Sequence, residues 1–250
     1  KKSGYLPPDY SNLSTEEKIN ILTTIAIPLK EEIFEDPLVT DTIATIKAIK
    51  NIQDFNGEAG CNRYIISQCN SALNVLEVYG LFLLCGWDKE AFTVNIIPLF
   101  ETVEDLKNAA GVMKQLYSNE IYAHHLVNRN KYQTIMLGFS DGTKDGGYLM
   151  ANWGIYKAKE NLTTISNQYN IEVLFFDGRG GPPSRGGGKT HKFYASMGSN
   201  ISNKEIQLTI QGQTVSSSFG TVESAQFNIE QLLHAGISNE LFNNRHITLE

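Results

Sequence analysis

The chain has few cysteines for its 250 residues, namely Cys61, Cys69 and Cys85. Their number is odd and no two of them have Cys-x-x-Cys spacing, so neither a disulfide framework nor a zinc site is indicated. We interpret all three as reduced thiols that pack in the protein interior, and we expect a cytoplasmic location.

A long apolar run is also missing from the sequence. The most apolar stretch covers residues 72–87, is interrupted by Asn74 and Glu77, and is too short to span a bilayer. No signal peptide precedes it. We therefore expect no membrane partner.

Positive charge is scarce as well. The sequence has 21 Lys and Arg against 27 Asp and Glu, which gives a formal net charge of −6. A general nucleic-acid-binding protein presents a basic surface, so no nucleic-acid partner is expected. In this acidic sequence, two arginines in one loop form a local cluster of positive charge that the overall composition does not explain.

That loop covers residues 178–188 and follows the apolar strand candidate at residues 173–176. It contains six glycines together with Arg179 and Arg185. Glycine lets backbone N–H groups approach a ligand closely, and each arginine offers forked, permanently charged donors to a phosphate or carboxylate. The loop therefore predicts an anion site. Its candidate binding residues are Arg179, Arg185, Gly180, Gly181, Gly186 and Gly187.

Pro183 distinguishes this loop from two common nucleotide-binding loops. A Walker A loop that ends at residues 188–190 would need glycine at position 183, and so would a dinucleotide fingerprint that starts at Gly178. Two Arg-Gly-Gly triplets also occur in disordered RNA-binding boxes, but here each occurs once, between a predicted strand and a predicted helix. None of these three kinds of site is expected.

Around the loop, short apolar runs alternate with helical patterns at a spacing of roughly 30 to 40 residues, which is typical of βα repeats. Near-continuous apolar strands indicate a parallel sheet that is covered on both faces. The predicted strands are residues 64–66, 94–100, 134–138, 173–176 and 206–210. The predicted helices are residues 72–84, 103–117, 147–168, 190–197 and 222–235.

Two further helices are predicted ahead of this alternating region. Ser14 and Glu17 have the spacing of a capping box, and an apolar-periodic run follows them up to Ile25. Asp36 is a predicted cap for a second helix over residues 37–52, which begins with proline. Both helices are interpreted as scaffold.

The carboxyl ends of parallel strands are where chemistry gathers, above all in (β/α)₈ barrels. Glu101 and Asp141 follow neighbouring predicted strands, so their carboxylates can share a hard divalent cation across roughly 5 Å. Taken singly, Glu101 is equally well explained as a helix N-terminal acid, and Asp141 as a turn residue. Lys144 can attract an anion at the start of a helix, although a solvated pair with Asp145 explains it as well.

Four segments of the chain carry a family resemblance. Residues 176–191 read FDGRGGPPSRGGGKTH, residues 136–147 read MLGFSDGTKDGG, and residues 97–102 read IPLFET. They resemble the FHGRGG...RGGGPTH, GYSDSxKDAG and VPLFET signatures of the phosphoenolpyruvate carboxylase family. The TIQG and SFG segments within residues 209–220 are similar to its VTxQGE...FG region. Order and spacing agree over about residues 64–235.

The resemblance implies a cytosolic, usually homotetrameric and allosteric enzyme that joins phosphoenolpyruvate and bicarbonate to give oxaloacetate and phosphate. In the family's scheme bicarbonate attacks the phosphoryl group, and the resulting enolate is then carboxylated. The implied fold is α/β, a partial (β/α)₈ barrel of about five parallel strands with additional helices. This barrel region is expected over residues 58–237, between a helical lead-in at residues 1–57 and a terminal tail at residues 238–250.

The resemblance also assigns roles to the site residues. It implies that Glu101 and Asp141 are ligands of Mg²⁺ or Mn²⁺, which acts as a Lewis acid on the developing enolate. Arg179 and Arg185 would be catalytic and substrate-binding residues that neutralise the transferring phosphoryl group, and Lys144 would help to bind bicarbonate or phosphate. In bacterial members the second arginine of the loop also takes part in the inhibitory aspartate site, so Arg185 is a candidate for regulation.

Some residues depart from the family pattern. Asp177 stands where the family has histidine and is counted among the substrate-binding residues, so its negative charge lies beside the predicted anion site. We expect it to weaken substrate binding unless it pairs with Arg179 or another residue compensates for its charge. Phe139, Gly142 and Lys189 replace tyrosine, serine and proline, and Lys189 can add a phosphate donor.

The sequence is expected to be an excised fragment, because it starts at Lys1 and ends with Leu249-Glu250, a dipeptide that expression vectors often leave. Five strands cannot close an eight-stranded barrel, and the family's catalytic histidine is expected upstream. We therefore expect negligible carboxylase activity from these residues alone. Two alternatives remain: a non-catalytic phosphate-binding or regulatory module derived from the carboxylase, and another metal-dependent enzyme that acts on phosphoenolpyruvate or pyruvate.

Overall fold

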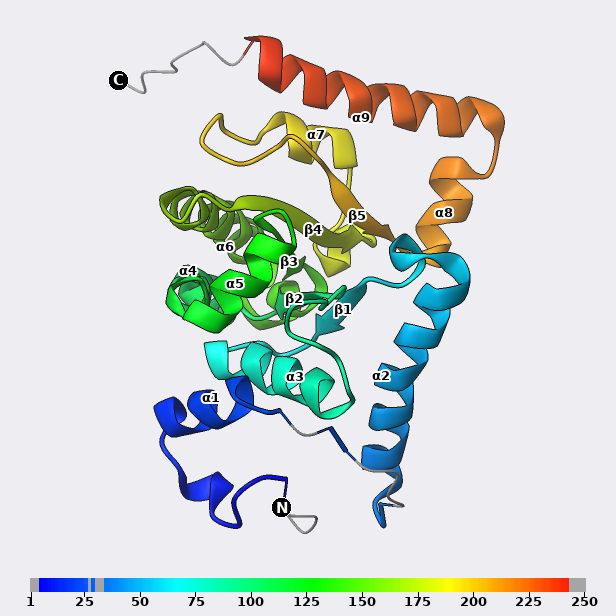
Figure 1. Cartoon of the computed structure of the whole chain (residues 1–250). Coiled ribbons are helices and arrows are strands. Elements are labelled where there is room, and N and C mark those ends of the chain that lie inside the picture. Colours follow the sequence, from blue (N-terminus) through cyan, green and yellow to red (C-terminus); the bar gives the residue numbers. More distant parts are fainter. Residues whose placement is uncertain (1–4, 27, 30–33, 243–250) are drawn as a thin grey trace. The chain divides into compact units, whose positions relative to one another are not determined.

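A computed structural model of the chain describes residues 5–26, 28–29 and 34–242. Within these residues the chain forms five strands and nine α-helices (Figure 1). Each strand is hydrogen-bonded to the next one along the chain, in the order β1-β2-β3-β4-β5, and the strands are parallel. The predicted fold class is confirmed as an α/β fold consistent with a partial (β/α)₈ barrel. The end of the predicted tail, residues 243–250, lies outside the described residues.

All five predicted strands are present in the structure. The strands are β1 (Arg63–Ile66), β2 (Asn95–Phe100), β3 (Tyr132–Gly138), β4 (Glu172–Gly180) and β5 (Gln207–Ile210). The helices are α1 (Thr15–Thr23), α2 (Pro37–Asn56), α3 (Ala72–Leu84), α4 (Val103–Ser118), α5 (Glu120–Asn128), α6 (Ser140–Gln168), α7 (Thr190–Ala195), α8 (Gly212–Phe219) and α9 (Val222–Phe242). Among the described helices, none combines the length and the apolar character that crossing a membrane requires.

The chain divides into two compact units. The first unit comprises the described residues up to Pro98 together with Gln115–Gln133. The second unit comprises Leu99–Lys114 and the described residues from Thr134 onward. Every site residue predicted from the sequence belongs to the second unit.

Side-chain caps start the first two α-helices. The Glu17 backbone N–H donates a hydrogen bond to Ser14 Oγ at 3.3 Å, and the Ser14 backbone N–H donates one to Glu17 Oε2 at 2.8 Å. These two bonds form the predicted capping box of α1. The Leu38 backbone N–H donates a hydrogen bond to Asp36 Oδ1 at 2.9 Å at the start of α2. Both predicted caps are confirmed.

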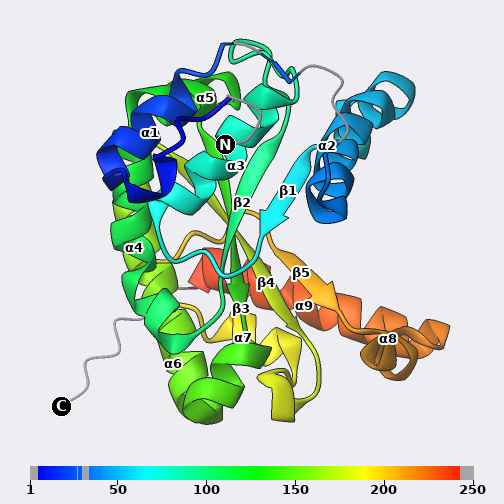
Figure 2. The ribbon, with the colours of Figure 1, turned by 90° about the horizontal axis from the view of Figure 1, so that it is seen from below.

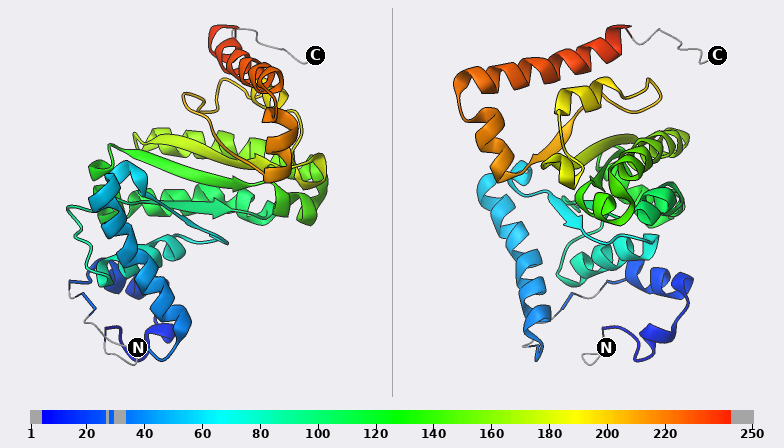
Figure 3. Two further views of the ribbon diagram at one scale, coloured as in Figure 1. Left: turned by 90° about the vertical axis from the view of Figure 1, so that its right-hand side faces the viewer. Right: turned by 180° about the vertical axis from the view of Figure 1, so that it is seen from behind.

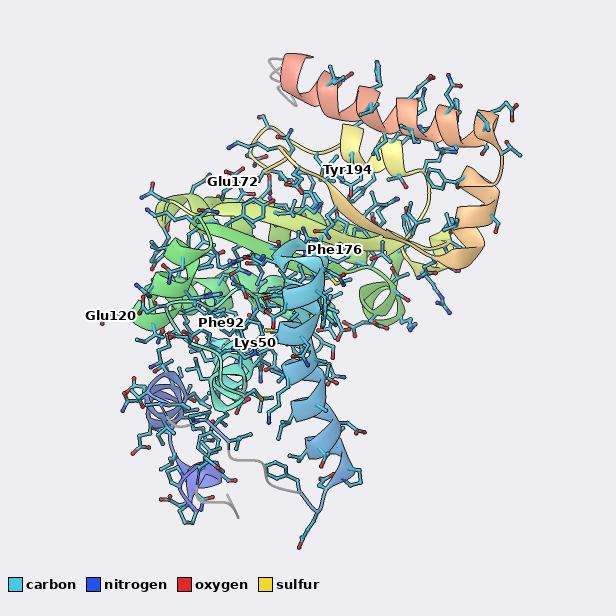
Figure 4. All side chains as sticks on the ribbon, turned by 45° about the vertical axis from the view of Figure 1, so that its right-hand side comes forward. Lys50, Phe92, Glu120, Glu172, Phe176 and Tyr194 are labelled. Carbon is cyan, nitrogen blue, oxygen red and sulfur yellow. The ribbon has the colours of Figure 1, made fainter. Side chains whose placement is uncertain are left out.

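An aromatic cluster forms the core of the first unit around Phe92, which is labelled in Figure 4. The ring centroid of Phe92 lies 5.1 Å from that of Tyr79 and 4.9 Å from that of His125. His125 belongs to α5 and is buried. Burial lowers the pKa of His125 to about 3, and the nearby charge of Arg129 adds to this effect. The imidazole is therefore neutral at physiological pH.

Helices surround β4 in the second unit. Helix α6 packs along β4 (Figure 2), and α9 packs against α7 (Figure 1). Strand β5 pairs in parallel with β4, and α8 leads from β5 to α9 (Figure 3). The buried apolar side chains of this unit include Ile155 and Leu162 of α6, Phe175 of β4 and Phe193 of α7. This packing fixes the strand that leads into the loop of glycines and arginines.

Two boundaries near this loop differ from the prediction. Strand β4 continues to Gly180 instead of ending with the apolar run, because Gly180 pairs with Ile210 of β5. The irregular part of the loop, called the Gly/Arg loop from here on, therefore covers residues 181–188. Helix α6 begins at Ser140 instead of residue 147, so Asp141 lies in its first turn, and the helical path is interrupted at Gly147, where φ is 78°. Helices α5 and α8 were not among the predicted helices.

Candidate functional site

Glu101 follows β2 directly and precedes the first turn of α4. This turn is capped by Thr102 and Asp105. The Thr102 N–H donates to Asp105 Oδ2 at 3.0 Å, and the Asp105 N–H donates to Thr102 Oγ1 at 3.1 Å. Because Thr102 and Asp105 cap α4, Glu101 is not needed as the acid at the N-terminus of this helix.

The end of β3 and the start of α6 lie against the backbone of Glu101. A Cβ atom added at Gly138 would lie 3.0 Å from Glu101 Cα, and one added at Gly142 would lie 3.3 Å from the Glu101 carbonyl oxygen. Glycine at both positions permits this close approach. Asp141 precedes Gly142 directly, so the structure brings the two predicted metal-ligand residues into one neighbourhood.

Asp141 and Lys144 form an ion pair on the first turn of α6. Lys144 Nζ lies 2.9 Å from Asp141 Oδ1, and both side chains are exposed. Asp145, the other expected partner of Lys144, instead accepts a hydrogen bond from the Val103 N–H at 3.1 Å. An exposed ion pair contributes only about 0–1 kcal/mol, so the carboxylate of Asp141 remains available to a stronger ligand.

The residues around Glu101 and Asp141 offer hard oxygen donors to a cation. Glu101 and Asp141 supply carboxylates, the ligand type that Mg²⁺ and Mn²⁺ prefer. Across the described parts of the chain, no group of three or more His, Cys, Asp and Glu side chains is arranged to hold a metal ion. A divalent cation held by this pair would therefore have to take its remaining ligands from water or substrate oxygens. We call Glu101, Asp141 and Lys144 the carboxylate site.

Asp177 lies on the face of β4 that α6 and α7 cover, and its side chain is only 1% exposed. Lys159 Nζ lies 2.7 Å from Asp177 Oδ2, and the Tyr194 hydroxyl donates a hydrogen bond to the same oxygen at 2.8 Å (Tyr194 is labelled in Figure 4). Lys159, rather than Arg179, is thus the residue that compensates for the charge of Asp177. Sequence patterns do not mark Lys159, because a lysine on a long helix normally faces solvent.

Aromatic rings surround the ammonium group of Lys159. Its Nζ lies 5.1 Å from the ring centroid of Phe175, 5.2 Å from that of Phe193 and 5.6 Å from that of Tyr194. Burial raises the pKa of Tyr194, and the nearby charge of Asp177 raises it further, so the hydroxyl stays protonated and donates. A cavity of about 20 Å³ adjoins Asp177, which is enough for one water molecule.

Arg179 follows two residues later on the same face of β4 and is 4% exposed. Its terminal nitrogens donate hydrogen bonds to the carbonyl oxygens of Gly187 at 3.3 Å and Gly188 at 3.2 Å. Its guanidinium carbon lies 4.5 Å from the ring centroid of Phe193. Burial lowers the pKa of Arg179. Two of the donors that the sequence predicts for an anion are therefore engaged by carbonyl groups of the Gly/Arg loop.

Close backbone packing explains several glycines of this region. A Cβ atom added at Gly180 would overlap the carbonyl oxygen of Thr209, and one added at Gly187 would overlap that of Gly181. Gly186 has a φ of 76°, which residues with a side chain rarely adopt. These glycines thus let the Gly/Arg loop close on itself and on β5, a structural role that the predicted anion contacts do not require.

The Gly/Arg loop packs onto the first turn of α6. A Cβ atom added at Gly186 would lie 2.7 Å from Thr143 Oγ1 and 2.9 Å from the Phe139 carbonyl oxygen. Thr143 stands between Asp141 and Lys144 in the sequence. The loop therefore lies next to the ion pair of the carboxylate site.

Arg185 lies on the solvent side of the loop, in the short 3-10 helix Pro183–Arg185, and is exposed. The predicted site residues consequently form two groups that differ in their access to solvent. The accessible group comprises Glu101, which is half-buried, and the exposed Asp141, Lys144 and Arg185. The buried group comprises Asp177, Arg179 and the glycines Gly180, Gly181, Gly186 and Gly187.

A comparison with known protein families adds an independent finding. The model of the family described as Phosphoenolpyruvate carboxylase matches residues 2–248. This match contains all five strands, the carboxylate site and the whole Gly/Arg loop.

Proposed function

This chain belongs to the phosphoenolpyruvate carboxylase family, and from this membership we propose that it carries the metal-binding and phosphoryl-binding part of a carboxylase active site. The reaction joins phosphoenolpyruvate and bicarbonate and releases oxaloacetate and phosphate. The observation that carries the proposal is the contact between the Gly/Arg loop and the turn that holds Asp141 and Lys144. Acidic ligands for a cation and basic donors for a phosphoryl group meet at this contact.

Each residue of the accessible group has a chemical role in this proposal. Glu101 and Asp141 would hold Mg²⁺ or Mn²⁺, which when bound supplies Lewis-acid stabilisation of negative charge on substrate oxygens. Lys144 is held by Asp141 at 2.9 Å, and its ammonium becomes free to pair with bicarbonate or phosphate once Asp141 has another partner. Arg185 is exposed and offers forked donors to the transferring phosphoryl group.

Arg179 has a more restricted role in the described conformation. Two of its five N–H groups donate to Gly187 and Gly188, so only the remaining donors are available to a phosphoryl oxygen in this conformation. Its buried positive charge also acts on the anion through the loop, in surroundings where water screens it less than at the surface.

A non-catalytic phosphate-binding or regulatory module is the second candidate function. One observation favours it: Asp177 replaces the histidine of the family signature. For the carboxylase itself, family membership supports a cytoplasmic enzyme whose whole form is a homotetramer.

Titration of Mn²⁺ by calorimetry tests the carboxylate site. We expect Glu101→Gln and Asp141→Asn to weaken Mn²⁺ binding by at least roughly tenfold each, because each removes one of two charged ligands. Glu104→Gln is the matched control, since Glu104 is an exposed acid on the first turn of α4. Equal Mn²⁺ affinity in all four proteins would contradict the proposed metal site.

Two measurements together separate the two candidate functions. One is a coupled assay for oxaloacetate, in which malate dehydrogenase consumes NADH, and the other measures the binding of phosphoenolpyruvate. We expect negligible turnover by these 250 residues alone, with phosphoenolpyruvate binding that requires Mn²⁺, Glu101 and Arg185. Phosphate binding that is independent of Mn²⁺ and of Glu101 would favour the regulatory module.

A further inference from the structure

A pocket of about 570 Å³ opens beside α6 and α7 in the second unit. This volume lies within the range of roughly 300–1,000 Å³ that is typical of small-molecule sites. Tyr148, Asn152 and Tyr156 are spaced by four residues on α6, so this helix turns one face toward the pocket. Helix α7 contributes Lys192 and Phe193, and Ser196 follows at its C-terminal end. No residue of the carboxylate site lines it.

The α6 wall of the pocket is aromatic. Trp153 and Tyr156 stack with their ring centroids 6.0 Å apart and their planes inclined by 13°. The Trp153 side chain is 56% exposed, although tryptophan usually buries most of its large surface. Lys157 Nζ lies 5.4 Å from the Trp153 ring centroid. The exposed part of this ring, beside a concave surface, offers an apolar area against which the ring of a ligand can pack.

Three cations line the same pocket. Lys189 and Lys192 are exposed, and Arg179 contributes the third positive charge from the interior. Among the described residues that line the pocket, none is Asp or Glu. Arg179 is 4% exposed, and its Nε is a buried donor that lacks a hydrogen-bond partner within the described structure. An unpartnered buried donor is uncommon, so its presence at this pocket points to an anion.

We propose that this pocket binds an organic phosphate that carries a planar ring. The ring stacks on Trp153, and the phosphate group lies between Lys189 and Lys192, which together match the charge of a phosphate dianion. The pocket shares Arg179 with the proposed carboxylase site, but it uses neither Glu101 nor Asp141.

The pocket is connected to the Gly/Arg loop through two of its lining residues. The Tyr148 hydroxyl donates a hydrogen bond to the Gly187 carbonyl oxygen at 3.3 Å, and Arg179 donates to the same oxygen. These two hydrogen bonds join the wall of the pocket to the loop of the proposed carboxylase site.

Calorimetric titration of phenyl phosphate into the whole 250-residue chain tests this site, with inorganic phosphate and phenol as probes for each half of the ligand. We expect phenyl phosphate to bind more tightly than either fragment. Lys192→Met and Trp153→Ala should each weaken its binding by roughly tenfold. Lys204→Met is the matched control, because Lys204 is exposed and pairs with Glu172 away from the pocket, and its variant should bind as the unchanged protein does.

Two results would overturn the proposal. Unchanged affinity of both pocket variants for phenyl phosphate would remove the pocket as its site, and inorganic phosphate binding as tightly as phenyl phosphate would remove the role of the ring. If Glu101→Gln abolishes phenyl phosphate binding while the pocket variants retain it, the probe binds at the carboxylate site. That result overturns the pocket and leaves the proposed function standing.

Discussion

Removal of Lys159 should destabilise the second unit far more than removal of an exposed lysine from the same helix. Lys159 Nζ and Asp177 Oδ2 lie 2.7 Å apart, and the two side chains are 3% and 1% exposed. In the Lys159→Met variant the carboxylate of Asp177 stays in the interior without its cationic partner, while methionine keeps much of the volume. Removal of one partner from a buried ion pair costs about 3–5 kcal/mol, which is a large part of the stability of a typical domain.

Lys157→Met is the matched control for this change. Lys157 lies two residues away on α6, its Nζ is 2.6 Å from Glu160 Oε2, and its side chain is 51% exposed, so its loss should cost about 0–1 kcal/mol. Urea unfolding followed by circular dichroism measures both free energies of unfolding. The double variant Lys159→Met with Asp177→Asn removes both charges and should recover part of the loss. A similar cost for the two lysine changes, or strict additivity in the double variant, would refute the reasoning.

Three further predictions concern Asp177, His125 and the Gly/Arg loop. Asp177→His restores the family residue but removes the counter-charge of Lys159, so urea unfolding should show a loss of stability that Lys159→Met partly reverses; no loss would contradict the ion pair. In the folded protein the pKa of His125 is lowered from 6.5 to about 3, so the unfolded chain binds a proton there more readily than the folded one. The contribution of the neutral His125 to the free energy of unfolding is therefore fully present above pH 6.5. It is lost as the pH falls toward 3, by about 1.4 kcal/mol per pH unit. His125→Phe should therefore flatten the decline of the free energy of unfolding between pH 6.5 and 5, and an unchanged slope would rule this out. Gly187→Ala should lower the thermal midpoint, because its Cβ overlaps the Gly181 carbonyl oxygen, whereas Gly111→Ala on open helix surface should stabilise by about 0.5–1 kcal/mol; equal shifts would exclude the overlap.

Local patterns account for the parts of the fold that the sequence predicts well. Apolar runs locate all five strands, and the capping side chains of Ser14 and Asp36 mark the starts of α1 and α2. Both signals arise within a few neighbouring residues, so they can be read without the tertiary structure. The same holds for Glu101 and Asp141, because parallel pairing of consecutive strands places the strand ends next to each other.

Local sequence patterns do not predict features that depend on residues far away in the sequence. Strand β4 extends through Gly178 and Gly180 because β5 pairs with it, although glycine has little intrinsic preference for strands. Lys159 looks like an ordinary surface lysine until the fold places Asp177 opposite it. The sequence places Arg179 in the loop, whereas the structure has it on β4, and its bonds to Gly187 and Gly188 depend on how the loop closes.

The buried pair of Lys159 and Asp177 also has a consequence for the evolution of the family. An aspartate at position 177 is tolerated when a lysine stands at position 159. A histidine at position 177 does not need that lysine as a counter-charge. A lineage that changes one position before the other passes through an intermediate that is less stable by about 3–5 kcal/mol. The two positions are therefore expected to covary among homologous sequences, with aspartate and lysine inherited together.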